Sequence, residues 1–194
     1  MPNTHALAAL DARRSVPARQ LADPGPDAAQ LRRMLASAVR VPDHGKRVPF
    51  RFLSIQGDAR DALGEAVAAR GLALRPDAGE AAAAKDRARF SHAPLVVVAI
   101  AVLDPDDGAI PEQERLLTAG CTCFALLQAA QGLGFGASWL TGWPAYDPEV
   151  MALLGLAANE RIAGFIHIGT PMLAPPERDR PDPDALLREW TPPA

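Results

Sequence analysis

The chain has 194 residues, of which 48 % are hydrophobic and 22 % are charged, and its formal net charge is −3. This composition is typical of a globular protein with a real core, and the length predicts one domain spanning residues 1–194. A nucleic-acid binder needs a clustered basic excess, so we expect no nucleic-acid partner. We expect no membrane partner either, because the longest apolar run, residues 94–103, is too short to span a bilayer.

Two features of the sequence favour a cytoplasmic location. The first residues contain no basic leader followed by a long apolar run, so we expect no signal peptide. The two cysteines, Cys121 and Cys123, fall in a predicted helix. Residues two apart on a helix point away from each other, which disfavours both a disulfide and a shared metal site. Free thiols of this kind suit a reducing compartment.

The first third of the chain predicts two helices separated by a proline-containing loop. A short helix ends at Arg13-Arg14-Ser15. Asp27 is expected to cap the second helix, because Gln30 follows it in the capping-box position, and an apolar stripe continues to Val39. The residues Val-Pro-Asp-His-Gly at 41–45 then break the helix.

The middle of the chain predicts two strands and two helices. Residues 50–55 alternate like a strand, and a helix should follow that Asp58 caps and Gly71 closes. The β-branched run at 94–103 reads as a strand buried on both faces. Residues 112–133 predict a long helix that is apolar nearly all round from Leu116 to Leu127, as expected at the centre of a domain or a dimer.

The last third predicts strands at 136–141 and 162–169, with a helix beginning at Asp147-Pro148 between them. The Pro-rich tail, residues 171–194, should lie extended over its own surface or a partner's. Together these elements predict an α+β fold in which helices flank a central mixed β-sheet and one long helix is buried.

The glycine run at 132–136 invites a dinucleotide-binding interpretation. A Rossmann fingerprint must follow a strand and open a helix, whereas these glycines follow a helix and lead into a strand. They are better interpreted as a helix C-cap and a tight turn. The four histidines lack ligand spacing, and no CxxC, HExxH or GxSxG motif occurs, so we expect no metal site and no catalytic nucleophile.

Several polar residues leave two interpretations open. Arg13 and Arg14 either favour a helix C-terminus as cations or, with Ser15, wrap a phosphate. Arg40 and His44 pose the same choice, and a histidine in a Pro-Asp-His-Gly turn is most often a surface residue. Tryptophans such as Trp139 are more often core or interface residues than substrate platforms.

The order and spacing of these segments along the chain are more informative than any single segment. Arg13-Arg14-Ser15, V-R-V-P-D-H at 39–44, Ala119-Gly120-Cys121, G-F-G-A-S-W-L-T-G at 134–142 and G-F-I-H-I-G-T-P at 164–171 follow one another with characteristic spacing. The pattern resembles the nitroreductase family, and within it the YdjA-like branch of NAD(P)H nitroreductases. The resemblance covers nearly the whole chain except about residues 70–85 and the last dozen.

The resemblance implies a homodimer with two FMN sites at the subunit interface. Arg13, Arg14 and Ser15 match the family's FMN-binding segment, and Arg40 and His44 match contacts that reach in from the other subunit. Trp139, Leu140 and Thr141 match a segment that lies along the flavin. That branch typically has Trp-Arg-Ser at this last segment, so Leu140 removes a cation beside the flavin.

The implied activity is the reduction of a small oxidised acceptor, such as a nitroaromatic or a quinone, with electrons from NADH or NADPH. The flavin carries this chemistry in a ping-pong cycle, and no side chain is needed as a nucleophile. The alternative is an FMN-binding protein of the same fold without nitroreductase turnover, either a flavin carrier or a flavin-fragmenting relative. The physiological acceptor and the choice between NADH and NADPH remain open in the sequence.

Overall fold

A five-stranded antiparallel sheet forms the centre of the computed structural model, which describes residues 4–193. The strands are β1 (Leu21–Ala22), β2 (Phe50–Gln56), β3 (Leu95–Val102), β4 (Gly136–Leu140) and β5 (Glu160–Pro171). Their order is β1-β5-β3-β2, and β4 pairs with β5. The α+β class is confirmed, but every pairing among the described strands is antiparallel rather than mixed. The reason is that β5 lies between β3 and β4, which run in the same direction but are not neighbours.

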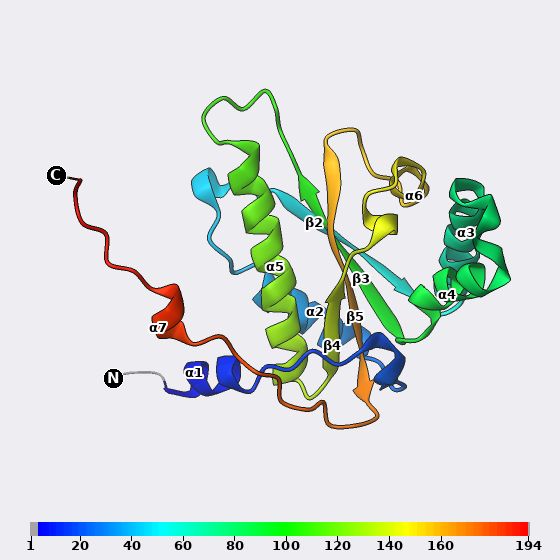
Figure 1. Cartoon of the computed structure of the whole chain (residues 1–194), viewed down its shortest axis with the longest axis horizontal. Helices are drawn as coiled ribbons and strands as arrows, with labels where there is room; N and C mark the ends of the chain where they lie inside the picture. The colour runs from blue at the N-terminus through cyan, green and yellow to red at the C-terminus, as the bar shows by residue number, and fades with distance from the viewer. Residues whose placement is uncertain (1–3, 194) are drawn as a thin grey trace.

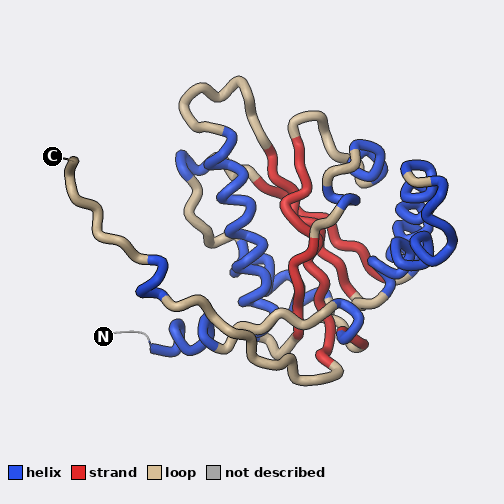
Figure 2. Tube along the Cα trace, viewed as in Figure 1, coloured by secondary structure: helices blue, strands red, loops and turns tan. Residues whose placement is uncertain are grey.

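Helices cover both faces of this sheet (Figures 1 and 2). The helices are α1 (Thr4–Asp11), α2 (Ala28–Ala38), α3 (Asp58–Leu74), α4 (Gly79–Ser91), α5 (Glu112–Gly132), α6 (Pro148–Leu153) and α7 (Pro183–Leu186), with short 3-10 turns η1 (Ala18–Gln20), η2 (His44–Lys46), η3 (Pro76–Ala78) and η4 (Trp143–Ala145). One hydrophobic cluster joins α2 and α5 to the sheet, and a second joins α3, α4 and α6 to the opposite face. None of the described helices is long and apolar enough to cross a membrane.

Strand β3 is buried on both faces, as its valine-rich sequence predicts. Val97 and Ala99 pack toward α5, while Val96 and Val98 pack toward α3 and α4. Fully burying an aliphatic side chain of valine size contributes about 1.5–3 kcal/mol relative to leaving it exposed. The strand therefore ties the two hydrophobic clusters into one framework.

Two local predictions at helix ends are confirmed. The Asp27 side chain accepts a hydrogen bond from the Gln30 backbone N–H, and the Gln30 side chain accepts one from the Asp27 backbone. At the end of α5, Gly134 has a φ of 83°, and the backbone N–H of Phe135 donates to Ala130 O at 2.9 Å. This is a glycine-terminated helix cap, so the glycine run is a turn and not a dinucleotide loop.

Two other helix boundaries are predicted wrongly. Asp58 is the first helical residue of α3, and Gly57 occupies the cap position. Gly71 lies inside α3, where a Cβ atom would come within 2.5 Å of Asp86 Oδ2. A glycine is needed at this position because a buried carboxylate from α4 approaches the helix closely, which is a tertiary contact that local patterns do not encode.

Helix α5 is buried on one side only. Cys123 and Leu126 are fully buried against the sheet, whereas Leu117 and Phe124 are 62 % and 41 % exposed. A single chain therefore leaves the second apolar face of α5 uncovered, so α5 is not buried on all sides within one domain, and its place at the centre of a dimer stays a prediction. The thiols of Cys121, which is exposed, and Cys123, which is buried, are both free.

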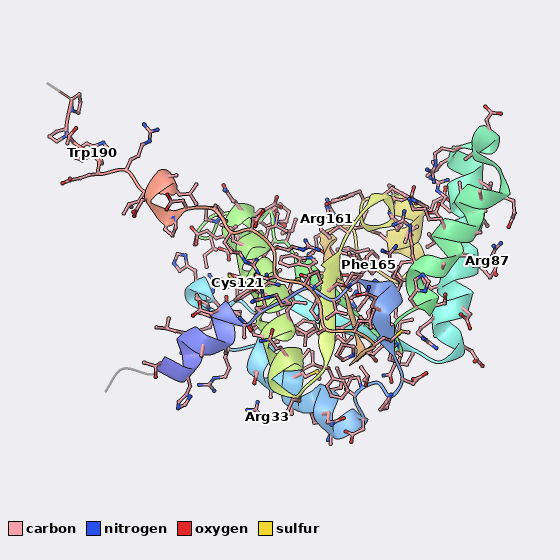
Figure 3. The ribbon with its side chains drawn as sticks, turned by 60° about the horizontal axis from the view of Figure 1, so that its bottom comes forward. Arg33, Arg87, Cys121, Arg161, Phe165 and Trp190 are labelled. Carbon is pink, nitrogen blue, oxygen red and sulfur yellow. The ribbon has the colours of Figure 1, made fainter. Side chains whose placement is uncertain are left out.

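The Pro-rich tail leaves the body of the protein instead of covering it. Figure 3 shows Trp190 standing clear of the other elements, and this side chain is 78 % exposed. Within the described residues 171–193, the hydrogen bonds to the body of the chain come from the first part of the tail, where Met172 N donates to Gln20 O and Arg180 donates to Arg13 O.

Candidate functional site

The segment after α1 is fixed along the free edge of β4. The backbone N–H of Val16 donates to Ala137 O at 3.0 Å. Gly136 makes this approach possible, because a Cβ atom there would lie 2.9 Å from Val16 Cγ2 and 2.8 Å from Leu21 Cδ2. The predicted Arg-Arg-Ser segment and the predicted strand segment are therefore neighbours in the fold.

Arg13 lines a cavity of about 410 Å³ and forms a polar pair with Ser15. Arg13 Nη1 donates to Ser15 Oγ at 3.2 Å. Arg180, from the tail, lines the same cavity and donates through Nη2 to Arg13 O at 3.4 Å. Two guanidinium groups thus line one cavity together with the carboxylates of Asp11 and Glu177, and Glu177 also accepts from Arg180 at 2.9 Å.

Arg180 is a residue that the sequence interpretation missed. It follows the Gly-Thr-Pro end of β5 within the charged run Glu-Arg-Asp-Arg at 177–180. The only available signal was this cluster of charge in an otherwise proline-rich tail, and nothing local connects the cluster to Arg13.

Arg14 does not line the Arg13 cavity, although its ion-pair partner does. Its guanidinium forms an ion pair with Glu177 and donates to Asp11 O at 2.6 Å. It lines a different cavity, beside Phe135 and Pro175. The predicted Arg13-Arg14-Ser15 site is therefore divided, with Arg13 and Ser15 hydrogen-bonded to each other and Arg14 lining a different cavity, while Glu177 pairs with both Arg14 and Arg180.

Leu140 and Thr141 line a second cavity, of about 330 Å³, between β4, η1 and α4. Three cationic side chains reach it, namely Arg19, Lys85 and Arg89. Phe90 and Phe165 give it apolar walls, and the residues that line it in the described part of the chain include no carboxylate. This cavity is consequently positive and partly apolar, a combination that suits a planar ligand with a negatively charged edge.

A buried histidine forms part of the same cavity. His167 on β5 is 2 % exposed, and its ring stacks on Phe90 with 6.2 Å between ring centroids. Burial, assisted by the charge of His92, lowers the pKa of His167 to about 4. The imidazole is therefore neutral at pH 7, and the cationic character of the cavity comes from its arginine and lysine side chains.

Trp139 points to the opposite face of the sheet from Leu140. Its Nε1 donates to Ala163 O at 3.0 Å, and its ring rests against Gly164, where any Cβ atom would collide with the indole. Trp139 and Arg40 line a shallow groove of about 530 Å³ along the exposed face of α5. Within one chain, Arg40 therefore lies near Trp139 and away from Arg13.

His44 lies apart from these cavities, on an exposed turn. Its Nδ1 is 2.7 Å from Glu114 Oε2 at the start of α5. The turn is strained, because Lys46 and Val48 have positive φ angles of 54° and 48°, which non-glycine residues rarely adopt. The Asp43 carboxylate holds it by accepting the backbone N–H groups of Arg47 and Val48. One chain alone does not bring His44 to Arg13 or Thr141.

Solved structures with the same arrangement define the class of fold. A nitroreductase-like family protein from Bacillus cereus superposes with a TM-score of 0.81 at 25 % identity, over 98 % of both chains. A variant of the FMN- and NADPH-dependent nitroreductase NfnB from Sphigopyxis sp. strain HMH gives a TM-score of 0.76 at 23 % identity, over 95 % of this chain and 98 % of that one. The fold is the nitroreductase fold.

Sequence comparison gives the family directly. The model of the nitroreductase family matches residues 10–170. An Escherichia coli protein named "Putative NAD(P)H nitroreductase YdjA" is 34 % identical over 185 residues, which is 94 % of this chain and 97 % of that protein. The chain belongs to the nitroreductase family, a family of oxidoreductases, and the family predicted from the sequence is confirmed.

Proposed function

We propose that this protein is an FMN-dependent oxidoreductase that takes electrons from NADH or NADPH and reduces a small oxidised acceptor, such as a nitroaromatic or a quinone. The observation that carries the proposal is the placement of Arg13 and Arg180 around one cavity, with Ser15 hydrogen-bonded to Arg13 and the same segment paired with β4 through Val16, in a chain of the nitroreductase family. FMN supplies the redox chemistry when bound, accepting two electrons from the nicotinamide and passing them to the acceptor in ping-pong order.

The residues present fit the phosphate of FMN. A phosphate dianion prefers charge-assisted donors, and arginine forks are the strongest of these. Arg13 and Arg180 supply two guanidinium groups, and Ser15 supplies a hydroxyl that is already aligned by Arg13. Glu177 balances these charges in one chain, and a phosphate group would take over that role.

The cavity at Leu140 and Thr141 fits the ring end of the cofactor. Its apolar walls, Phe90 and Phe165, exclude water from a planar ligand, and its cations favour negative charge on the edge of the ring. No side chain is asked to act as a nucleophile, so the task of this chain is to bind, orient and stabilise charge.

We propose that the functional unit is a homodimer with FMN at the subunit interface. Leu116, Leu117 and Phe124 form an exposed apolar face on α5, and such a face usually marks a protein interface. A second copy that covers this face would also bring its own Arg40 and His44 toward the partner's flavin. The tail beyond Arg180, which has no surface of its own to cover, would pack on the partner.

The same proposal includes one FMN-binding domain over residues 1–194 and a cytoplasmic location. The free thiols of Cys121 and Cys123 support a reducing compartment.

Colour and bleaching provide the first test. The purified protein should be yellow, heat-denatured supernatant should contain FMN rather than FAD or riboflavin, and NADH or NADPH should bleach the bound flavin without oxygen. Colourless protein that fails to take up added FMN would contradict the proposal. Protein that holds FMN but is bleached by neither nicotinamide would instead favour a flavin carrier or a flavin-fragmenting activity.

A mixed dimer tests whether each site is shared. Arg13→Glu and His44→Asp chains, carrying different affinity tags, are co-expressed and the heterodimer is isolated. If Arg13 and His44 from different chains build one site, the heterodimer has one site with both lesions and one with neither. It should then recover about half of the wild-type flavin per chain, provided the two sites act independently. An intact heterodimer without flavin would reject the shared site.

A further inference from the structure

Arg89 differs from the other cations of the cavity beside Leu140 and Thr141 because its guanidinium is fixed. Its Nε donates to Asp86 Oδ1 at 2.8 Å, one turn earlier on α4. Arg19 and Lys85 line the same cavity, and neither forms an ion pair within the described residues. A cation held in place stabilises charge without reorganising, whereas a mobile one must first be ordered.

The carboxylate that holds Arg89 is itself firmly placed. Asp86 is 3 % exposed, and its Oδ1 also accepts the indole N–H of Trp143 at 3.2 Å. Its Oδ2 accepts Arg75 Nη2 at 2.9 Å. Burial alone would raise the pKa of Asp86, but the hydrogen bonds from Arg89 and Trp143 and the charges of Arg89 and Arg75 outweigh it, so the pKa is lowered. Asp86 is therefore ionised at neutral pH.

Helix α3 has a glycine at the position that faces this carboxylate. Gly71 of α3 faces Asp86, and a Cβ atom there would lie 2.5 Å from Asp86 Oδ2 and 3.3 Å from Trp143 Cζ2. A larger residue at 71 would displace the carboxylate without removing its charge. The absence of a side chain at Gly71 therefore leaves room for the Asp86 carboxylate beside α3.

We propose that Asp86 is a positioning residue, which fixes the Arg89 guanidinium on the wall of the cavity so that Arg89 stabilises the negatively charged edge of reduced FMN. The inference rests on the proposed FMN-dependent function and adds to it the residue pair that sets the electron affinity of the cofactor. Two-electron reduction leaves negative charge on the ring edge of FMN, and Leu140 contributes no cation beside the cavity. Among the described cations that line this cavity, Arg89 is the one whose guanidinium is held by an ion pair.

The test compares the dissociation constants of oxidised and reduced FMN, measured by anaerobic titration, and the midpoint potential of the bound flavin. Arg89→Gln should weaken the binding of reduced FMN relative to oxidised FMN by about tenfold, which corresponds to a potential about 30 mV lower for a two-electron couple. Lys85→Gln is the matched control, because it removes the same charge from the same cavity. Its effect should stay below about threefold.

Two further variants distinguish a positioning role of Asp86 from a direct effect of its charge on the flavin. Gly71→Ala keeps every charge but displaces Asp86, and it should lower the relative affinity for reduced FMN in the same direction as Arg89→Gln. Asp86→Asn removes a negative charge, which alone would favour reduced FMN. Combining it with Arg89→Gln in a double-mutant cycle exposes the coupling between the two residues. We expect Asp86→Asn to favour reduced FMN only when Arg89 is absent.

The outcomes separate this inference from the proposed function. A wild-type protein that binds no FMN overturns the function and the inference together. If FMN binds and is reduced, but Arg89→Gln changes the ratio of the two dissociation constants no more than Lys85→Gln does, only the role of Arg89 is wrong. If Asp86→Asn has the same effect in both backgrounds, or Gly71→Ala has none, Asp86 does not position Arg89.

Discussion

Arg13→Glu should weaken FMN binding far more than riboflavin binding, because riboflavin lacks the phosphate. A hydrogen bond to a charged group contributes about 1.5–3 kcal/mol. At about 1.4 kcal/mol per factor of ten, this corresponds to a loss of about 10- to 150-fold in FMN affinity. The reversed charge would add repulsion from the phosphate, while the half-exposed position of Arg13 allows salt to screen part of it. We therefore expect about 100-fold for FMN and less than about threefold for riboflavin.

Fluorescence titration of apoprotein with each flavin measures the two losses. Arg14→Glu is the matched control, because Arg14 is the adjacent cation but lines a different cavity. Its effect on FMN should be at least several-fold smaller than that of Arg13→Glu. Added salt should weaken FMN binding to the wild type and leave riboflavin binding nearly unchanged.

Equal losses for FMN and riboflavin would refute this reasoning. They would mean that Arg13 supports the fold of the segment after α1 and does not contact a phosphate. A larger loss for Arg14→Glu than for Arg13→Glu would also refute it, since it would place the phosphate in the cavity beside Phe135.

Three other outcomes follow from packing and charge. Arg51 donates to both Glu160 oxygens, at 2.6 and 2.7 Å, and these bonds lower the pKa of Glu160. Stability from this pair is present above about pH 4.5 and is lost as the pH falls through the lower folded value. In urea unfolding, Glu160→Gln should therefore cost about 2 kcal/mol at pH 7, the size of a hydrogen bond to a charged group, and less in acid; a constant cost would exclude an ionic contribution. Gly64→Ala should cost about 1–3 kcal/mol in thermal unfolding, because its Cβ would strike the backbone oxygen of Arg87; unchanged stability would show that α3 and α4 move apart freely. Deletion from Asp182 onward should weaken the dimer in sedimentation, and an unchanged dissociation constant would exclude the tail from the interface.

The sequence by itself determined the features that depend on neighbouring residues. Strand β3, the capping box at Asp27 and the glycine turn after α5 all follow from local periodicity, capping and backbone freedom. The order of the motifs identified the family, because that order belongs to the sequence and needs no coordinates. The segment at Arg13 and Ser15 could be proposed as a phosphate site for the same reason.

Only the tertiary structure decided what meets in space. It joined Arg180 to Arg13 across most of the chain and placed the Arg14 side chain in a different cavity. It also placed β5 between β3 and β4 and left one face of α5 open. Gly71 shows the physical reason most clearly. Its role depends on a carboxylate that approaches from another helix, and such distant contacts are set by packing of whole elements, which no local pattern of residues contains.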